Sequence, residues 1–245
     1  MKTITFISDF GTNDWFTAAV KGEIFKIADD VRIVDITHKI MPFDIRSAAF
    51  LLSAVYRDFP KGTVHLAVID PGVGGKRKPI VVDSLGYYFV GPDNGLFSYI
   101  YSQDSRVYRI RIPVGASNTF HARDVFGPAA AKLATGIKPH ELGEKLADYV
   151  HFEIPKISRS GGFVQGEIVY IDHFGNCITN VPNREDIRVI QVSGRSISVK
   201  KSYSNGKLDE LVCVKGSIGY YEIASNQGSA RNRLDAHIGM TVEAG

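Results

Sequence analysis

The sequence of 245 residues has little cysteine, no excess of charge of either sign and no long apolar run. Its two cysteines, Cys177 and Cys213, lie far apart and do not form a metal-type pair, which is compatible with a reducing cytoplasm. The net charge is only +3 and no block of basic residues occurs, so there is no electrostatic case for a nucleic-acid partner. No segment is apolar for long enough to cross a bilayer or to act as a cleavable leader, so we expect no membrane association.

What the sequence does have is the composition of an ordinary globular protein. Hydrophobic residues make up 44% of the chain and charged residues 22%. The length is sufficient for one large domain or two modest ones, and neither an internal repeat nor a low-complexity tract interrupts it.

The first half alternates between strand and helix patterns, with Asp14 and Asp44 as the expected N-caps of its first two helices. Strand, helix, strand, helix, strand in succession favours parallel pairing with right-handed crossovers. We therefore predict an α/β N-terminal domain over residues 1–157, with a mostly parallel sheet in Rossmann-like layers. The expected elements that open it are strand 3–8, helix 15–27, strand 31–36, a helix from 45 and strand 64–69.

Further elements complete the predicted first domain. Two strands, 79–83 and 87–90, are joined at Leu85-Gly86, and the Gly-Pro-Asp-Asn-Gly turn at 91–95 leads into a short helix through residue 100. A strand at 107–112 and an alanine-rich helix at 125–134 follow.

The pattern changes after a Ser/Gly-rich joint at residues 158–162, which is typical of a domain boundary. Short strands with turn signals then continue to the end of the chain. We predict a small all-β, barrel-like domain over residues 163–245.

Polar side chains follow the predicted buried strands of the first domain. Asp9, Asp35 and Asp70 come near three carboxyl ends, the edge of an open α/β sheet where ligands bind. Asp70 is followed by Pro71 and by a glycine-rich loop that can approach a ligand closely and that leads to Arg77. His121 follows a later strand.

Each of these residues has a simpler explanation when it is taken alone. Asp70 can cap the turn after its strand, Arg77 can be a surface charge, and His121 can be structural. Taken together, a carboxylate and an imidazole can orient and deprotonate a water molecule, while a guanidinium stabilises hydroxide-like charge. The acidic strand ends disfavour a phosphate ligand and favour a cationic or hydroxyl-rich one such as a ribose, and no cluster has metal-ligand spacing.

Two stretches of the second domain contain candidate binding residues. Asp172 and Asn176 flank a Phe-Gly turn, where they can bind ammonium or amide groups or simply close a hairpin. Asn226 follows a strand, where it can read a purine edge or act as a cap.

Six distinctive motifs occur in order along the chain. They are Ser-Asp-Phe-Gly-Thr-Asn-Asp (8–14), Ile-Asp-Pro-Gly-Val-Gly (69–74), Gly-Pro-Asp-Asn-Gly (91–95), Thr-Phe-His-Ala-Arg-Asp (119–124), Asp-His-Phe-Gly-Asn (172–176) and Gly-Ser-Ile-Gly-Tyr (216–220). Together they resemble the motifs of the S-adenosyl-L-methionine hydrolases, also called SAM hydroxide adenosyltransferases, a family related to the fluorinase and chlorinase enzymes. The resemblance implies a fluorinase-like, nucleoside-binding hydrolase that cleaves S-adenosyl-L-methionine with water into adenosine and L-methionine.

The resemblance also implies roles for individual residues and a mode of assembly. The family's water-activating triad falls on Asp70, Arg77 and His121, its ribose-binding aspartate on Asp9, and its pocket aromatics on Phe43 and Phe120. Asp172, Asn176 and Ser217 match positions around the methionine end of the ligand, and Asn226 an adenine-binding position. No cofactor or metal is implied. Family members are homotrimers with sites between the first domain of one subunit and the second domain of the next.

The chain departs from the halogenase branch at several positions. The halide-binding relatives have Tyr, Thr and Ser where this chain has Asp70, Val73 and Ala122, and a carboxylate there would repel a halide. Ile218 replaces the arginine that the halogenases use at the methionine site. A halogenase on the same scaffold, or a non-catalytic protein that binds adenosine or S-adenosyl-L-methionine, are the alternatives to a hydrolase.

Overall fold

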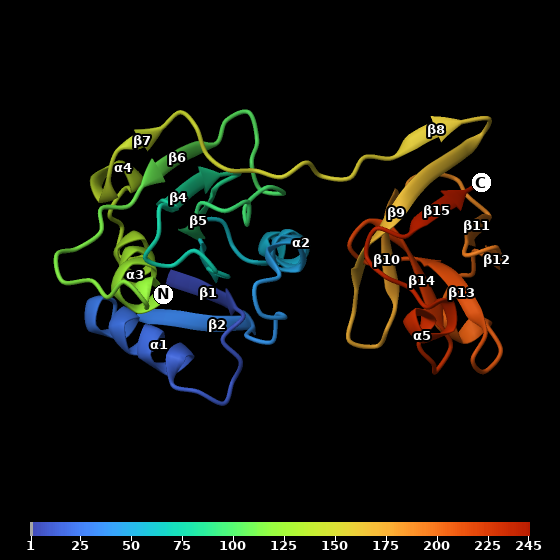
Figure 1. The fold of residues 1–245 in the computed structure, drawn as a ribbon, viewed down its shortest axis with the longest axis horizontal. Helices are drawn as coiled ribbons and strands as arrows, with labels where there is room; N and C mark the ends of the chain where they lie inside the picture. Colours follow the sequence, from blue (N-terminus) through green and yellow to red (C-terminus); the bar gives the residue numbers. More distant parts are fainter. Residues whose placement is uncertain (1) are drawn as a thin grey trace. The chain divides into compact units, whose positions relative to one another are not determined.

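The computed structural model describes residues 2–245, so Met1, the first residue of the predicted first domain, lies outside the described part. The chain divides into two compact units, one ending at Glu153 and the other comprising Ile154–Gly245 (Figure 1). The last residues of the first unit are hydrogen-bonded to the rest of that unit: Val150 N–H donates to Asp93 Oδ1, and Phe152 N–H donates to Ser98 Oγ.

The first unit is built on a mixed sheet. Among the described residues its strand order is β2-β1-β3-β5-β4-β6-β7, and the neighbours from β2 to β5 are parallel. The pairings of β4 with β5 and β6, and of β6 with β7, are antiparallel. The prediction of a mostly parallel, Rossmann-like sheet is thus confirmed only in part, since the tight Leu85-Gly86 turn can join only antiparallel neighbours. The strands are β1 Lys2–Ser8, β2 Val31–Thr37, β3 Val64–Val68, β4 Pro79–Ser84, β5 Tyr87–Pro92, β6 Arg106–Arg109 and β7 Lys145–Leu146.

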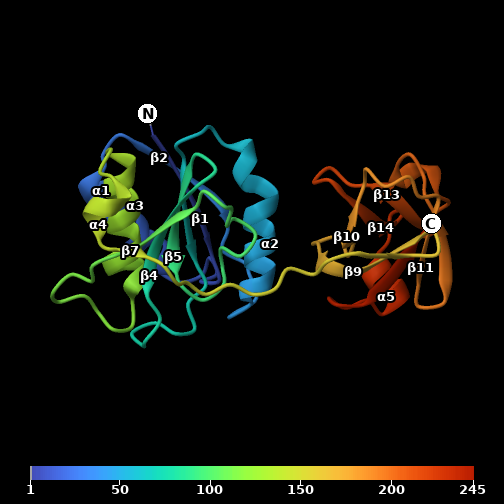
Figure 2. The ribbon, with the colours of Figure 1, turned by 90° about the horizontal axis from the view of Figure 1, so that it is seen from above.

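Helices cover both faces of this sheet. Figure 2 shows α1, α3 and α4 on one face and α2 on the other. No helix in the described part of the chain is long and apolar enough to span a membrane. The helices are α1 Phe16–Ile27, α2 Ile45–Val55, α3 Gly127–Ala134 and α4 Pro139–Leu142, with a 3₁₀ turn at Tyr56–Asp58 and a π-helical turn at Ala122–Phe126.

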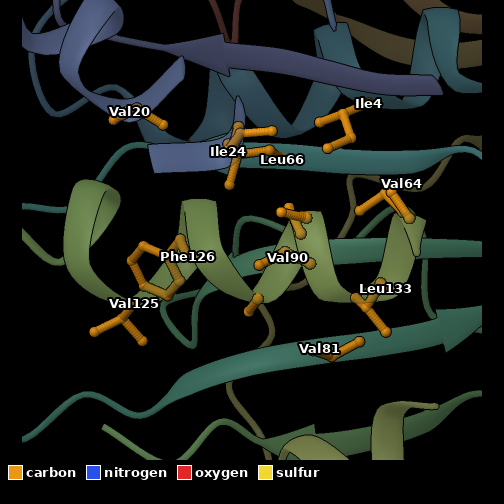
Figure 3. Packing of buried hydrophobic residues seen from close by; sticks show 14 of the residues in the cluster. Ile4, Val20, Ile24, Val64, Leu66, Val81, Val90, Val125, Phe126 and Leu133 are labelled. Atoms are coloured by element: carbon orange, nitrogen blue, oxygen red, sulfur yellow. The ribbon is translucent and has the colours of Figure 1, made fainter. Parts of the chain in front are cut away.

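The apolar sequence of β3 reflects its burial on both faces. Val64, Leu66 and Val68 pack into the core beneath α1 and α3, which Figure 3 shows from close by. Ala67 and Ile69 point the other way, into the core beneath α2. Because successive side chains of a strand alternate between faces, a strand covered on both sides is largely apolar, and His65 is the one polar side chain of β3.

The local predictions have mixed outcomes. Asp44 caps α2 as predicted, since its side chain accepts the Ser47 N–H. Asp14 does not cap α1: Trp15 is the N-cap, makes no side-chain capping bond and already has helical backbone angles. The short helix expected at residues 96–100 is wrong, because Ser98 Oγ bonds back to the Gly95 carbonyl and the segment folds as successive turns.

The second unit is a nearly closed, all-antiparallel sheet, as the predicted barrel-like domain requires. Its order is β12-β11-β15-β9-β10-β14-β13 with β8 on β9, and a bridge from Val199 to Cys213 brings the two edges together. Sequence patterns do not reveal β10 or α5. The elements are β8 Ser158–Ser160, β9 Phe163–Ile171, β10 Cys177–Pro182, β11 Val189–Val192, β12 Arg195–Ser198, β13 Leu211–Lys215, β14 Tyr220–Ser225, β15 Thr241–Ala244, α5 Ala230–Leu234 and a 3₁₀ turn at Tyr203–Asn205.

A buried histidine makes the stability of the first unit depend on pH. His65 is fully buried on β3, with Nδ1 2.8 Å from Thr5 Oγ1 and its ring stacked on Phe89. Burial lowers the pKa of His65 from 6.5 to about 3. The unfolded chain takes up this proton below pH 6.5 and the folded chain does not, so stability is full above that pH and falls as the pH is lowered toward 3.

We expect the free energy of unfolding of the wild type to be lower at pH 5 than at pH 7, and His65→Leu to reduce that difference by about 2 kcal/mol. Urea denaturation of both proteins at the two pH values measures it. The same pH dependence in wild type and variant would contradict the assignment to His65.

Candidate functional site

Asp70, Arg77 and His121, which are distant in sequence, form one hydrogen-bonded group. Arg77 Nε donates to Asp70 Oδ1 at 2.8 Å, and Nη2 donates to Asp70 Oδ2, which makes the pair bidentate. The same Nη2 lies 2.8 Å from His121 Nδ1. The Asp70 and Arg77 side chains are only 6% and 9% exposed, so water screens this pair far less than a surface ion pair.

The contact with Arg77 fixes the tautomer of His121. A guanidinium can only donate hydrogen bonds, so Nδ1 of the imidazole must accept, and the neutral ring carries its proton on Nε2. Burial lowers the pKa of His121, and the positive charge of Arg77 lowers it further. His121 is therefore a neutral imidazole near pH 7 whose remaining free group is an Nε2–H donor.

The loop from Asp70 to Arg77 depends on a close approach of two backbone segments. Gly74 has a φ of +72°, and a Cβ atom placed on it would lie 2.1 Å from the Asn118 carbonyl oxygen. Asn118 lies shortly before His121, so the contact seats the loop with Arg77 against the segment with the imidazole. On the sheet side, Asn94 Nδ2 donates to the carbonyl of Ile69, the residue before Asp70.

Asp70 and His121 line a pocket of about 420 Å³, within the size range of small-molecule sites. The register of the sheet places Asp9 beside them, because Ser8 at the end of β1 pairs with Val68 near the end of β3. The positions matched to the halide site also line it. The pocket residues are Asp9, Phe10, Phe16, Pro42, Phe43, Val68, Asp70, Val73, Thr119, Phe120, His121 and Ala122.

Asp9 holds the segment that forms one side of this pocket. Its Oδ2 accepts the Phe43 N–H at 2.9 Å, while Phe43 itself is exposed and has a φ of 71°. That left-handed conformation is strained in a bulky residue, and such strain tends to persist at functional sites. Burial raises the pKa of Asp9, the Phe43 N–H opposes the rise, and the charge of Asp70 adds to it.

Three aromatic rings that line the pocket pack against one another. The ring centroids of Phe10 and Phe16 are 5.7 Å apart, and Phe120 lies 5.3 Å from Phe16 and 6.2 Å from Phe10. Sequence reasoning finds Phe120 but misses Phe10 and Phe16. Phe10 follows Asp9 directly, and Phe16 begins α1, so their nearness to a strand end was the available signal.

Other candidates lie outside this pocket. Asp35, although it is close to the end of β2, is bound by Lys21 Nζ at 2.6 Å and does not line it. A larger hollow of about 560 Å³ around Arg109 and Glu144 contains none of the predicted site residues. No group of three or more His, Cys, Asp or Glu side chains in the described part of the chain could hold a metal ion.

In the second unit, Asp172 and Asn176 form a turn. Asp172 Oδ1 accepts the backbone N–H groups of Phe174 and Asn176, and Oδ2 accepts Asn176 Nδ2 at 2.8 Å. The two side chains thus close the β9–β10 hairpin, one of the two possibilities that the sequence allows. Both remain partly exposed.

Ser217 and Asn226 lie at opposite ends of β14. Ser217 is exposed in the turn before the strand, next to Ile218. Asn226 follows the strand, and its Nδ2 donates to the Gly206 carbonyl at 2.9 Å, a bond that leaves the side-chain oxygen and the second N–H without a described partner. The register of Cys177 with Ile223 places the 172–176 hairpin at the Asn226 end.

Comparisons with known proteins agree over the length of both units. The family models for the N-terminal and C-terminal domains of SAM hydroxide adenosyltransferase match residues 4–143 and 166–243. A relative from Thermus thermophilus named (R)-S-adenosyl-L-methionine hydrolase is 36% identical and covers 99% of each chain. A fluorinase from an Actinoplanes species is 27% identical over 98% of this chain and 96% of its own.

A solved structure has the same fold. It is described as an uncharacterized conserved protein from Thermotoga maritima, has a TM-score of 0.90 and 31% identity, and is matched over 98% of this chain and 99% of its own.

The contact of Gly74 with Asn118 can be tested by stability. We expect Gly74→Ala to destabilise the first unit by more than about 1–2 kcal/mol, because it adds a clash with backbone to the strain of a positive φ. The control is Gly115→Ala, since Gly115 has a φ of +86° and nothing within 4 Å, so that only the strain remains. Equal losses in thermal or urea denaturation would contradict the role given to the contact.

Proposed function

The chain belongs to the SAM hydroxide adenosyltransferase family, and we propose that Asp70, Arg77 and His121 carry out its reaction on a water molecule. It hydrolyses S-adenosyl-L-methionine to adenosine and L-methionine. The observation that supports the residue assignment is that the buried, hydrogen-bonded group faces a small-molecule pocket through Asp70 and His121.

The hydrogen-bond polarity of the group gives each member a role. His121 Nε2–H donates to the oxygen of the attacking water, and the carboxylate of Asp70 accepts a proton from it. Arg77 fixes both side chains and supplies positive charge beside the developing hydroxide. Asp70 has lone pairs to spare, because each of its oxygens accepts only one bond from Arg77.

The rest of the pocket suits the adenosyl part of the substrate. Asp9 accepts hydrogen bonds from the ribose hydroxyl groups, and Phe43 and Phe120 provide aromatic contact area. The two carboxylates, Asp9 and Asp70, also favour the positively charged sulfonium centre, as we expect from a pocket that selects a cation.

The chemical step is an in-line displacement at the ribose C5′. The oxygen of the activated water bonds to C5′ as the C5′–S bond breaks, and the sulfur leaves with the bonding electron pair as the neutral thioether of methionine. Because this leaving group needs no protonation, the protein has to supply position and desolvation more than acid catalysis. We propose that the reaction requires neither a metal nor a cofactor.

The pocket disfavours the two alternatives. The halide-site positions Asp70, Val73 and Ala122 all line it, and the carboxylate repels an anion at the point where a halogenase needs one. A protein that only binds adenosine has no use for a buried, bidentate Asp–Arg pair linked to an imidazole.

We propose that Asp172, Asn176, Ser217 and Asn226 complete the substrate site in a cytoplasmic homotrimer. The free, buried cysteines suit a reducing cytoplasm, and the exposed position of Ser217 suits contact with a ligand. Ile218 provides no charge for the methionine carboxylate, so backbone N–H groups or Ser217 must bind it.

The reaction is tested with the purified protein, S-adenosyl-L-methionine and water enriched in ¹⁸O, in the presence of EDTA and of chloride. We expect adenosine with one ¹⁸O in its 5′-hydroxyl group, equimolar methionine and no 5′-chloro-5′-deoxyadenosine by mass spectrometry. Unlabelled adenosine, a halogenated product or unchanged substrate at stoichiometric enzyme would each refute water attack at C5′.

The roles of the group are tested by variants. We expect Asp70→Asn and His121→Ala to lower kcat by about 100-fold or more while adenosine affinity stays within a few-fold, since both act on the water. The control is Asp83→Asn, which breaks another Asp–Arg pair of the same sheet, with Arg106, away from the pocket. Parallel losses of adenosine affinity and kcat would contradict these roles.

A further inference from the structure

A second polar network lies at the carboxyl ends of β1 and β2, and the proposed reaction does not use it. Ser8 Oγ, at the end of β1, is 2.7 Å from Nδ1 of His38, which follows β2. His38 Nε2 is 3.2 Å from Asp35 Oδ1, and the other oxygen of Asp35 is bound by Lys21. Ser8 is fully buried and His38 is 6% exposed.

The hydrogen-bond directions in this network follow from the charge at one end. The Asp35 carboxylate lies 3.2 Å from Nε2 of His38 without forming a hydrogen bond with it, and its negative charge favours the proton on Nε2 over Nδ1. Nδ1 of His38 therefore accepts from the Ser8 hydroxyl, whose oxygen in turn faces the Phe10 N–H at 3.4 Å. Burial lowers the pKa of His38 while Asp35 opposes it, so the ring is neutral, as these directions require.

Serine, histidine and aspartate in a row also occur in nucleophilic hydrolases, but this group cannot act in that way. Ser8 is 0% exposed and packed inside the sheet, so no substrate carbonyl can reach its hydroxyl. Any effect of this network on the reaction must therefore be indirect, through the backbone segments that it fixes.

It holds the residues on either side of Asp9. Ser8 precedes Asp9, and the N–H of Phe10, which follows it, faces the Ser8 oxygen. In addition, Gly11 N–H donates to the backbone carbonyl of His38 at 2.7 Å. The His38 ring also packs edge-on against Phe6 at 4.6 Å, which limits its rotation.

We propose that His38, through its hydrogen bond with Ser8, is a positioning residue that fixes the Asp9 carboxylate for the substrate's ribose. The ribose contact itself is part of the proposed function, on which this inference rests. Asp9 already uses one oxygen to hold Phe43, so a small rotation of the β1 end displaces both the ribose ligand and the wall of the pocket. The network thus affects substrate affinity without touching the substrate.

Two substitutions of His38 separate its two contacts. His38→Asn retains an acceptor near the position of Nδ1, for Ser8, whereas His38→Gln retains a donor near Nε2, for Asp35, and leaves Ser8 unpaired. We expect His38→Gln and Ser8→Ala to raise the KM for S-adenosyl-L-methionine and the Kd for adenosine by about tenfold, with kcat within about twofold. His38→Asn should stay within about twofold of wild type in all three quantities.

The sheet offers a matched control in Thr5 and His65, where a buried hydroxyl also lies 2.8 Å from an imidazole Nδ1. Neither residue lines the pocket, so Thr5→Ala should lower the thermal midpoint as Ser8→Ala does but leave KM and Kd unchanged. Circular dichroism and calorimetric adenosine titrations on the same samples correct each Kd for any unfolded fraction.

Asp9→Asn distinguishes a failure of this inference from a failure of the proposed function. If Asp9→Asn weakens adenosine binding while Ser8→Ala and His38→Gln bind as wild type does, the positioning role is wrong and the ribose contact stands. If Asp9→Asn binds adenosine normally, the ribose contact itself is wrong, and the role of His38 falls with it. Equal losses of affinity in Thr5→Ala and Ser8→Ala would also overturn the inference, because they would indicate a general effect of stability.

Discussion

The bidentate hydrogen bond between Arg77 and Asp70 is the interaction on which the functional site depends. A guanidinium that donates through Nε and Nη2 to one carboxylate has its plane fixed, and this directs a second Nη2 proton at His121 Nδ1. The imidazole tautomer follows from that one geometry. Lysine could replace the charge of Arg77 but not the fork that sets the other two side chains.

The parallel half of the sheet explains why acidic groups gather at this place. Ser8 pairs with Val68, so the residues that follow both strands emerge side by side, and Asp9 and Asp70 face one pocket. Burial is the main cause of the raised pKa of Asp9, and repulsion by the charge of Asp70 adds to it. In the proposed site a cationic substrate relieves both effects, so that the fold and the ligand are electrostatically matched.

Periodicity and strand ends predict much of this arrangement, and the exceptions have identifiable causes. The apolar run of β3 ending at Asp70 and the cap at Asp44 follow from local rules. The tight Leu85-Gly86 turn makes β4 antiparallel to β5, but local patterns do not show that β5, rather than β4, pairs with β3. The distances among Asp70, Arg77 and His121 also lie beyond local patterns, because they depend on the contact of Gly74 with Asn118. For Asp35 the strand-end rule predicts too much. It lies near the end of β2, as Asp9 and Asp70 lie near theirs, but it is paired with Lys21 and His38 and does not line the pocket.

The reaction removes the positive charge of the substrate, so the acidic pocket attracts the substrate more strongly than the products. In the proposed reaction a sulfonium cation enters a site lined by Asp9 and Asp70, and its sulfur and adenosyl group leave as a neutral thioether and a neutral nucleoside. The attraction that favours the substrate is therefore absent from both products. The proton that Asp70 takes from the attacking water neutralises this carboxylate for a time. Once the proton passes to solvent, the negative charge of the pocket is restored. In this proposal, selectivity for the cation and release of the products both follow from the same pair of carboxylates.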